Sequence, residues 1–179
     1  MPLLRASGLT KRFPGTTRAA LQDVDVSLGS GETLAVVGES GSGKSVTALS
    51  ILRLIPDPPG RIEEGEILFE GKDLLKLDDA GIRAIRGDRI AMIFQEPMSS
   101  LNPALTVGLQ VGEPINLHRK TVWVKALDKA AELLGKVRIP DGRSRLSSYP
   151  HQYSGGMRQR VMIAMALACQ PQLIIADEP

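Results

Sequence analysis

Apolar residues along the chain fall into short runs and alternating stretches, separated by glycine, proline and polar residues. From 24 to 28, apolar and polar residues alternate, which predicts a strand with one buried face. Residues 33–37 form an apolar run, and this pattern predicts a fully buried strand. Further apolar runs over 66–70, 89–94 and 173–176 predict additional strands.

Helical spacing of apolar residues dominates the other parts of the chain. The pattern predicts a helix over 45–54, helical structure from 106 to about 137, and a helix from 158 to about 169. Because strands alternate with helices, we expect an α/β fold with a mostly parallel sheet that binds ligands at the carboxyl ends of its strands. The central helical stretch differs from its flanks and predicts an all-helical insert within that fold.

The composition is that of an ordinary globular protein and excludes several classes of function. The chain has 22 basic and 20 acidic residues, and aromatic residues make up only 3%. Nothing in this balance indicates nucleic acid as a partner. Cys169 is the only cysteine, so no internal disulfide can form and a reducing, cytoplasmic setting is expected. No signal peptide or membrane-spanning segment is predicted.

A glycine-rich loop lies between the first predicted buried strand and the helix that follows it. Its residues are Gly38, Glu39, Ser40, Gly41, Ser42, Gly43, Lys44 and Ser45. This order matches the phosphate-binding loop of nucleotide-binding proteins. The glycines let successive backbone amides point at one anion, and the helix start adds its positive dipole end. Lys44 would reach the β and γ phosphates and the Ser45 hydroxyl would ligate Mg²⁺, so ATP and Mg²⁺ are the expected cofactors.

Two carboxylates follow the last predicted strand. Asp177 and Glu178 stand where, in P-loop ATPases, an Asp supports magnesium and a neighbouring Glu polarises the attacking water. Many surface strands also end in an Asp-Glu pair, so the pair by itself does not identify a site. Its position downstream of a phosphate loop makes Asp177 a candidate metal ligand and Glu178 a candidate catalytic base.

A Ser-Gly-Gly turn at Ser154, Gly155 and Gly156 points to a family. Here the chain resembles the ABC ATPases, whose signature has the form Leu-Ser-Gly-Gly-Gln, with Tyr153 and Met157 at the outer positions. A hydroxyl and flexible amides at a helix start offer donors to a phosphate, although an ordinary helix N-cap has the same composition. The resemblance implies that this element closes over the γ phosphate held by a second ATPase subunit.

Two further positions take their roles from the same resemblance. Gln95 occupies the position of the family's glutamine loop, which contacts magnesium and water, and joins Lys44 and Glu178 as a catalytic candidate. Phe13 occupies the position of an aromatic that stacks on adenine, although an aromatic near an early strand is also typical of a core. The resemblance implies a P-loop NTPase fold with a parallel-sheet core, an N-terminal antiparallel β subdomain and a helical insert.

The resemblance also sets the expected domain organisation. Residues 1–179 would form a partial ABC ATPase domain, incomplete at the C-terminus. About 1–105 and 158–179 would form the α/β core with the β subdomain, and about 106–157 the helical subdomain with the signature. In this family the chain continues after Pro179 with another strand, which lies between the strand before the phosphate loop and the strand before the acidic pair. Without it these two buried strands would lose their shared neighbour. We therefore expect the 179-residue chain alone to be unstable, with little or no ATPase activity.

Three segments narrow the resemblance to the ATP-binding subunits of bacterial dipeptide, oligopeptide and nickel importers. They are 95–103, 149–152 and 158–168. This resemblance implies a peripheral subunit on the cytoplasmic face of the inner membrane that energises import. It would pair with a second ATPase subunit, dock on transmembrane permeases through the segment after Gln95 and the helical insert, and serve a solute-binding protein indirectly. His151 is part of the lead-in to the signature or a partly buried structural histidine.

Two other functions stay open at this point. ABC-type ATPases of DNA repair and chromosome maintenance carry the same motifs, but they usually insert a long coiled coil between phosphate loop and signature. The segment between Ser45 and Ser154 has no sustained heptads, which disfavours this function. The second alternative is a non-catalytic nucleotide-binding or regulatory fragment.

Overall fold

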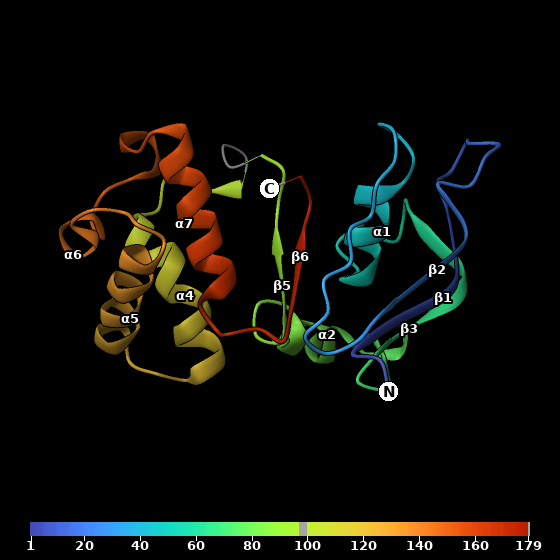
Figure 1. The fold of residues 1–179 in the computed structure, drawn as a ribbon, viewed down its shortest axis with the longest axis horizontal. Coiled ribbons are helices and arrows are strands. Elements are labelled where there is room, and N and C mark those ends of the chain that lie inside the picture. The colour runs from blue at the N-terminus through green and yellow to red at the C-terminus, as the bar shows by residue number, and fades with distance from the viewer. Residues whose placement is uncertain (97–99, 179) are drawn as a thin grey trace. The chain divides into compact units, whose positions relative to one another are not determined.

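The structure, a computed structural model, describes residues 1–96 and 100–178 (Figure 1). Its contacts divide the chain into two compact units, Met1–Arg83 and Ala84–Pro179. Among the residues described, no helix is both long enough and apolar enough to cross a lipid bilayer.

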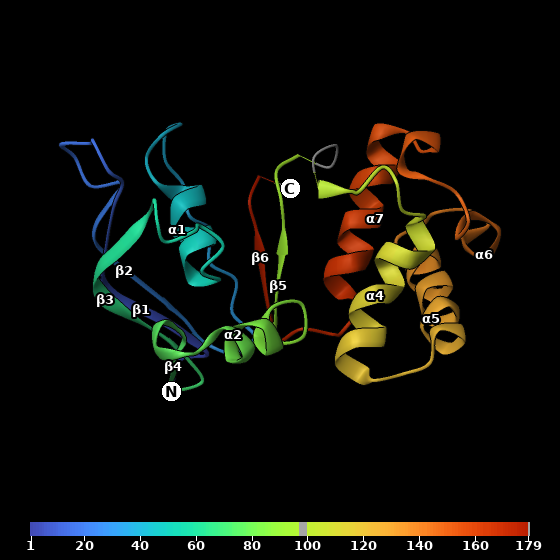
Figure 2. The same cartoon turned by 180° about the vertical axis from the view of Figure 1, so that it is seen from behind.

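The first unit is built on a four-stranded antiparallel sheet with strand order β2-β1-β3-β4 (Figures 1 and 2). In the central pair, Leu4 lies opposite Phe69 and Ala6 opposite Ile67, and all of these side chains are buried. Such apolar cross-strand pairs stabilise a sheet, and they confirm the predicted antiparallel β subdomain. The elements are β1 (Leu4–Arg12), β2 (Leu21–Leu28), α1 (Lys44–Ile51), β3 (Arg61–Phe69), β4 (Lys72–Asp73), η1 (Leu74–Lys76) and α2 (Asp79–Ile85), the last of which runs into the second unit.

The predicted strand over residues 33–37 is wrong. Residues 32–39 have no regular secondary structure, and Leu34, Val36 and Val37 are 49%, 56% and 88% exposed. Within ranges 1–96 and 100–178 no strand pairs with this segment. An apolar run becomes a buried strand only when neighbouring strands take up its backbone hydrogen bonds and cover its side chains.

The second unit combines a parallel strand pair with a group of helices. α7 lies between the strand pair and helices α4 and α5 (Figures 1 and 2). Ala91 and Ile93 pack against Met162 and Ala166 and join the strands to α7. The elements are β5 (Ile90–Ile93), α4 (Val107–Arg119), α5 (Trp123–Lys136), α6 (Gly142–Arg145), η2 (Pro150–Gln152), α7 (Gly155–Leu167) and β6 (Leu173–Ala176).

The predicted helical stretch from 106 to 137 consists of two helices. The Thr106 hydroxyl caps α4 by accepting a hydrogen bond from the Leu109 N–H at 3.4 Å. Lys120, with φ of +48°, ends α4, and α5 buries Ala126 and Ala130 on one face. The predicted α/β fold with a helical insert is thereby confirmed. The domain boundaries at 105 and 157 stay a prediction.

Candidate functional site

The glycine-rich loop folds over itself immediately before α1. Gly41 and Gly43 have φ values of +81° and +98°, a backbone conformation that favours glycine. A Cβ on Gly38 would lie 2.7 Å from Ser42 Oγ, and a Cβ on Gly43 would lie 3.0 Å from the carbonyl oxygen of Ala20. Gly41 therefore needs glycine for its dihedral angles, and Gly43 needs it both for its dihedral angles and for its close approach to the Ala20 backbone.

Lys44 points back across this loop. Its Nζ donates hydrogen bonds to the carbonyl oxygens of Gly38, at 2.8 Å, and Glu39, at 3.0 Å. The N-cap of α1 is Gly43, which makes no side-chain cap to the helix. A helix start with an ammonium beside it attracts anions. The predicted phosphate-binding residues are accessible: Gly38, Glu39, Ser40, Gly41 and Ser42 are exposed, and Gly43, Lys44 and Ser45 are half-buried.

Phe13 follows β1 directly, and its ring is half-buried. The ring edge packs so closely on Gly60 that a Cβ there would lie 2.8 Å from Phe13 Cε1. The tip of the β1–β2 hairpin and the glycine-rich loop lie at the same end of the first unit (Figures 1 and 2). Stacking of this ring on adenine stays a prediction.

The pairing of β5 with β6 brings two predicted catalytic residues together. The strands are parallel and in register, with Ile93 opposite Ala176. Gln95 and Glu178 each follow their strand by the same number of residues, so they meet at the carboxyl edge of the pair. Gln95 Nε2 donates a hydrogen bond of 2.5 Å to Glu178 Oε2.

Asp177 lies at the same edge. Its backbone N–H donates to the carbonyl oxygen of Ile93 at 3.0 Å, which continues the ladder beyond the strand end. Glu178 has φ of +46°, so the chain turns directly after Asp177. The second unit therefore gathers Gln95, Asp177 and Glu178 at one edge of its sheet.

Ser154 is the N-cap of α7. Its hydroxyl accepts a hydrogen bond from the Met157 N–H at 3.4 Å, and Ser154, Gly155 and Gly156 are all exposed. A Cβ on Gly155 or Gly156 would meet no atom within 4 Å, so the helix start faces open space in this chain. The arrangement fits both an ordinary helix cap and a helix start that binds an anion.

Tyr153 and Arg158, for which the sequence predicted no role, make hydrogen bonds to the backbone of the segment that precedes α7. Tyr153 is buried and donates its hydroxyl to the carbonyl oxygen of Arg145 at 2.8 Å. Burial raises the pKa of Tyr153 above its usual value. Arg158 Nε donates to the carbonyl oxygen of Pro150 at 2.8 Å. The sequence feature that could have identified Tyr153 is a tyrosine at the position where the ABC ATPase signature has leucine.

His151 is exposed, and its ring stacks on that of Tyr149 with a centroid separation of 5.7 Å and an interplanar angle of 10°. The alternative of a partly buried structural histidine is therefore wrong. His151 belongs to the surface of the lead-in to α7.

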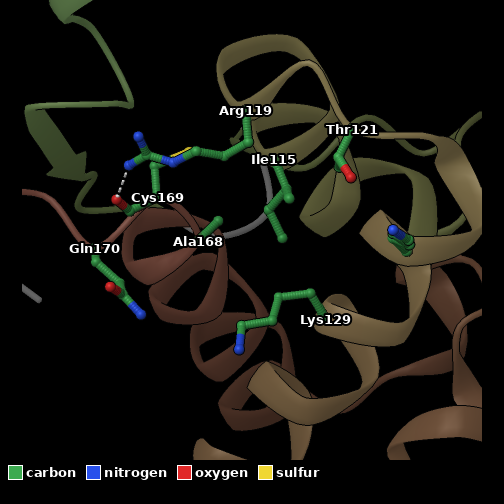
Figure 3. Close-up of a pocket in the computed structure, with 8 residues that line it drawn as sticks. Ile115, Arg119, Thr121, Lys129, Ala168, Cys169 and Gln170 are labelled. Atoms are coloured by element: carbon green, nitrogen blue, oxygen red, sulfur yellow. Dashed lines mark hydrogen bonds between the residues drawn. The ribbon is translucent and has the colours of Figure 1, made fainter.

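A hollow of about 320 Å³ lies among α4, α5 and the end of α7 (Figure 3). The residues predicted for the site are not among those that line it. Arg119 Nη2 donates to the carbonyl oxygen of Cys169 at 2.6 Å and pairs with Asp88 at 2.9 Å. Lys129 pairs with Glu132 at 2.8 Å. Arg119 therefore neutralises the C-terminal end of α7, and this hollow is a junction of helices.

The donor chemistry of the predicted metal residues fits magnesium. The Ser45 hydroxyl, the Asp177 carboxylate and the Gln95 Oε1 are hard oxygen donors of the kind that Mg²⁺ prefers. Gln95 contacts Glu178 through its Nε2, so that bond does not engage its oxygen. In the part of the chain that the structure describes, no three His, Cys, Asp or Glu side chains cluster so as to hold a metal ion. Magnesium in nucleotide sites usually takes its remaining ligands from phosphate and water.

Known sequences resemble the chain over almost its whole length. The profile of the ABC transporter family matches residues 21–179. A protein of Brucella melitensis with the provisional name peptide import ATP-binding protein is 53% identical, over 99% of this chain and 55% of its own length. The oligopeptide transport ATP-binding protein OppD of Bacillus subtilis is 55% identical, over 94% of this chain and 47% of its own length. The chain thus spans about half the length of these curated relatives.

Solved structures share the fold. The ATP-binding cassette MJ0796, in a dimeric post-hydrolysis state bound to ADP and Pi, matches with a TM-score of 0.84 and 30% identity, over 97% of this chain and 73% of its own. CbiO1 of Clostridium perfringens, part of the ABC transporter complex CbiONQ, matches in fold with a TM-score of 0.78 and 24% identity, over 99% of this chain and 66% of its own.

Proposed function

The chain belongs to the ABC transporter family, and from this premise we propose that it binds ATP with Mg²⁺ and hydrolyses it to energise the import of peptides or a similar small solute. The observation that carries the proposal is the glycine-rich loop, in which Lys44 folds over the loop carbonyls at the start of α1. The names of the Brucella melitensis and Bacillus subtilis relatives, at 53% and 55% identity, support peptides as the solute class.

The triphosphate would bind where the loop amides and Lys44 converge. The ammonium now donates to two neutral carbonyl oxygens, and a charged phosphate oxygen is a stronger acceptor. Ser45, Asp177 and Gln95 would hold Mg²⁺, which supplies positive charge to the phosphates. Phe13 would stack on the adenine ring.

Glu178 would act as the general base toward the attacking water. The hydrogen bond from Gln95 reaches only Oε2, so the carboxylate is oriented while Oε1 stays available to accept the proton. General-base assistance of this kind contributes roughly 10²- to 10⁴-fold to a rate. Gln95 would therefore both orient the base and contact the metal.

A second ATPase subunit would complete the nucleotide site. The start of α7 at Ser154, Gly155 and Gly156 is exposed and open, so its hydroxyl and amides can face a nucleotide held by another subunit. The dimeric state of the cassette MJ0796 supports such an assembly.

The helical insert would dock on a transmembrane permease at the cytoplasmic face of the inner membrane, with a solute-binding protein acting through that permease. Leu109 and Leu117 of α4 are 39% and 63% exposed, and Leu105, just before the helix, is 38% exposed. Trp123 and Val124, at the start of α5, are 42% and 71% exposed. Exposed apolar side chains on both helices of the insert support an interaction surface.

Replacing Lys44 with alanine, in the protein at its full natural length, tests the nucleotide site. A hydrogen bond to a charged group contributes roughly 1.5–3 kcal/mol, so ATP affinity measured by calorimetry should fall about 10- to 100-fold. Lys72→Ala removes an exposed lysine of the same unit and should leave the affinity unchanged. Unchanged ATP affinity in Lys44→Ala would refute the site.

The two alternative functions are separated by ATP turnover in the same protein. A non-catalytic nucleotide-binding protein would bind ATP without hydrolysing it. A DNA repair ATPase would be stimulated by DNA. We expect hydrolysis that membranes containing the permease stimulate and that DNA does not.

A further inference from the structure

A lysine is buried directly behind the ring that is proposed to stack on adenine. Lys11 lies in β1, on the same side as Leu9, and is only 2% exposed. Lysine is seldom buried, because moving its ammonium out of water is costly unless a partner receives it. Burial accordingly lowers the pKa of Lys11, and the carboxylate of Asp57 opposes that shift. The Lys11 ammonium is therefore expected to make specific contacts that offset the cost of its burial.

Those neighbours are Gly60 and Phe13. Lys11 Nζ donates a hydrogen bond of 3.1 Å to the carbonyl oxygen of Gly60. The same ammonium lies over the ring of Phe13, 5.9 Å from its centroid, where a cation is attracted to the π face. Gly60 packs against both side chains, because a Cβ there would fall 2.8 Å from Phe13 Cε1 and 3.1 Å from Lys11 Cε. The lysine, the glycine and the ring therefore pack as one unit.

Lys11 is also joined to the phosphate loop through the backbone. The Ala20 N–H donates to the Lys11 carbonyl oxygen at 2.8 Å, and Leu21 pairs with Lys11 in the β1–β2 ladder. Gly43, at the end of the loop, rests on both partners: its Cβ would lie 3.0 Å from the Ala20 carbonyl oxygen and 3.0 Å from Leu21 Cδ2. One residue thus connects the ring of Phe13 with the loop that would bind phosphate.

We propose that Lys11 is the positioning residue of the nucleobase site. Its ammonium, anchored on the Gly60 carbonyl, holds one face of the Phe13 ring so that the opposite face receives the purine of a nucleotide whose phosphates lie at the glycine-rich loop. This inference rests on the proposed function, because it requires Phe13 to stack on the base. A lysine that merely fills the core would stabilise the unit without distinguishing base from phosphate.

Comparing ATP with inorganic tripolyphosphate separates these roles, because tripolyphosphate has no base to stack. Lys11→Met keeps an unbranched apolar stem and removes the ammonium. In the protein at its full natural length, calorimetry should show ATP affinity reduced about 3- to 30-fold, the range from an exposed to a desolvated cation–π contact, while tripolyphosphate affinity stays within about twofold. An equal loss for both ligands, or no loss for either, would overturn the proposal.

Phe13→Ala distinguishes failure of this inference from failure of the proposed function. If Phe13→Ala leaves ATP affinity unchanged, the nucleobase site itself is wrong. If Phe13→Ala weakens ATP but Lys11→Met does not, only the role of Lys11 is wrong. The exposed Lys72 supplies the matched control, Lys72→Met, which should change neither affinity.

A second variant decides the question if Lys11→Met does not fold, as judged by circular dichroism. Gly60→Ala places a methyl group against both Phe13 and Lys11 and displaces the ring from its support. The same selective loss of ATP affinity is expected. A ratio of ATP to tripolyphosphate affinity equal to that of the wild type would overturn the proposal.

Discussion

Gln110, in α4, holds residues 102–105 against the helical insert. Its side chain is 4% exposed. Its Oε1 accepts from the Asn102 N–H at 2.8 Å, and its Nε2 donates to the carbonyl oxygens of Asn102 and Leu105, both at 3.0 Å. One buried amide therefore supplies the backbone partners that no helix or strand provides in this segment. Replacing Gln110 with leucine removes all of these bonds while keeping a side chain of similar size.

The expected loss of stability follows from these contacts. Each hydrogen bond contributes roughly 1 kcal/mol net, so their sum is about 3 kcal/mol. Burying leucine returns about 1 kcal/mol, and Asn102 and Leu105 are exposed enough for water to replace part of what is lost. Gln110→Leu should therefore lower the free energy of unfolding by about 2 kcal/mol. For a domain of this size that corresponds to a fall in Tm of about 4–8 °C.

Thermal unfolding of the protein at its full natural length, followed by circular dichroism, measures this change. The matched control is Gln170→Leu, at an exposed position beside the hollow of Figure 3, which should shift Tm by less than about 2 °C. Because the segment is also proposed to dock on the permease, Gln110→Leu should reduce transport more than basal ATP turnover. A Tm of Gln110→Leu equal to that of the wild type would show that the amide does not hold the segment.

Tyr153→Phe removes the hydrogen bond to Arg145 and should lower the free energy of unfolding by about 1 kcal/mol in urea titrations. Burial raises the folded-state pKa of Tyr153 above the usual 10.0, so the stability that its neutral phenol contributes is fully present below pH 10.0 and is lost as pH rises through the folded-state pKa. Tyr153→Phe should therefore lack this loss of stability at alkaline pH. Identical dependence of the free energy of unfolding on pH in the variant and the wild type would contradict the reasoning. Glu178→Gln keeps an acceptor for Gln95 and should reduce ATP turnover by at least about 100-fold with ATP affinity nearly unchanged, whereas near-normal turnover would exclude Glu178 as the base.

Local pattern located the elements whose form depends on near neighbours in the chain. The apolar run at Leu173–Ala176 is a strand with the predicted bounds, although it was expected to be buried and Ile174 is 40% exposed. The helical spacing after residue 106 became helices. The same rule misplaced the segment 33–37, which has the composition of a buried strand and lies exposed. A strand exists only through its neighbours, so composition alone cannot say whether a run is paired.

The amino-acid sequence by itself determined the glycine-rich loop, the Ser-Gly-Gly helix start and the acidic pair, because each depends on residue types at fixed short spacing. Only the tertiary structure decided that Gln95 reaches Glu178 and that Lys11 lies behind Phe13. The first contact depends on the parallel register of β5 and β6, and the second on which face of β1 the sheet buries. Register and burial are set by packing between segments distant in the chain, and no local periodicity records which segments will meet.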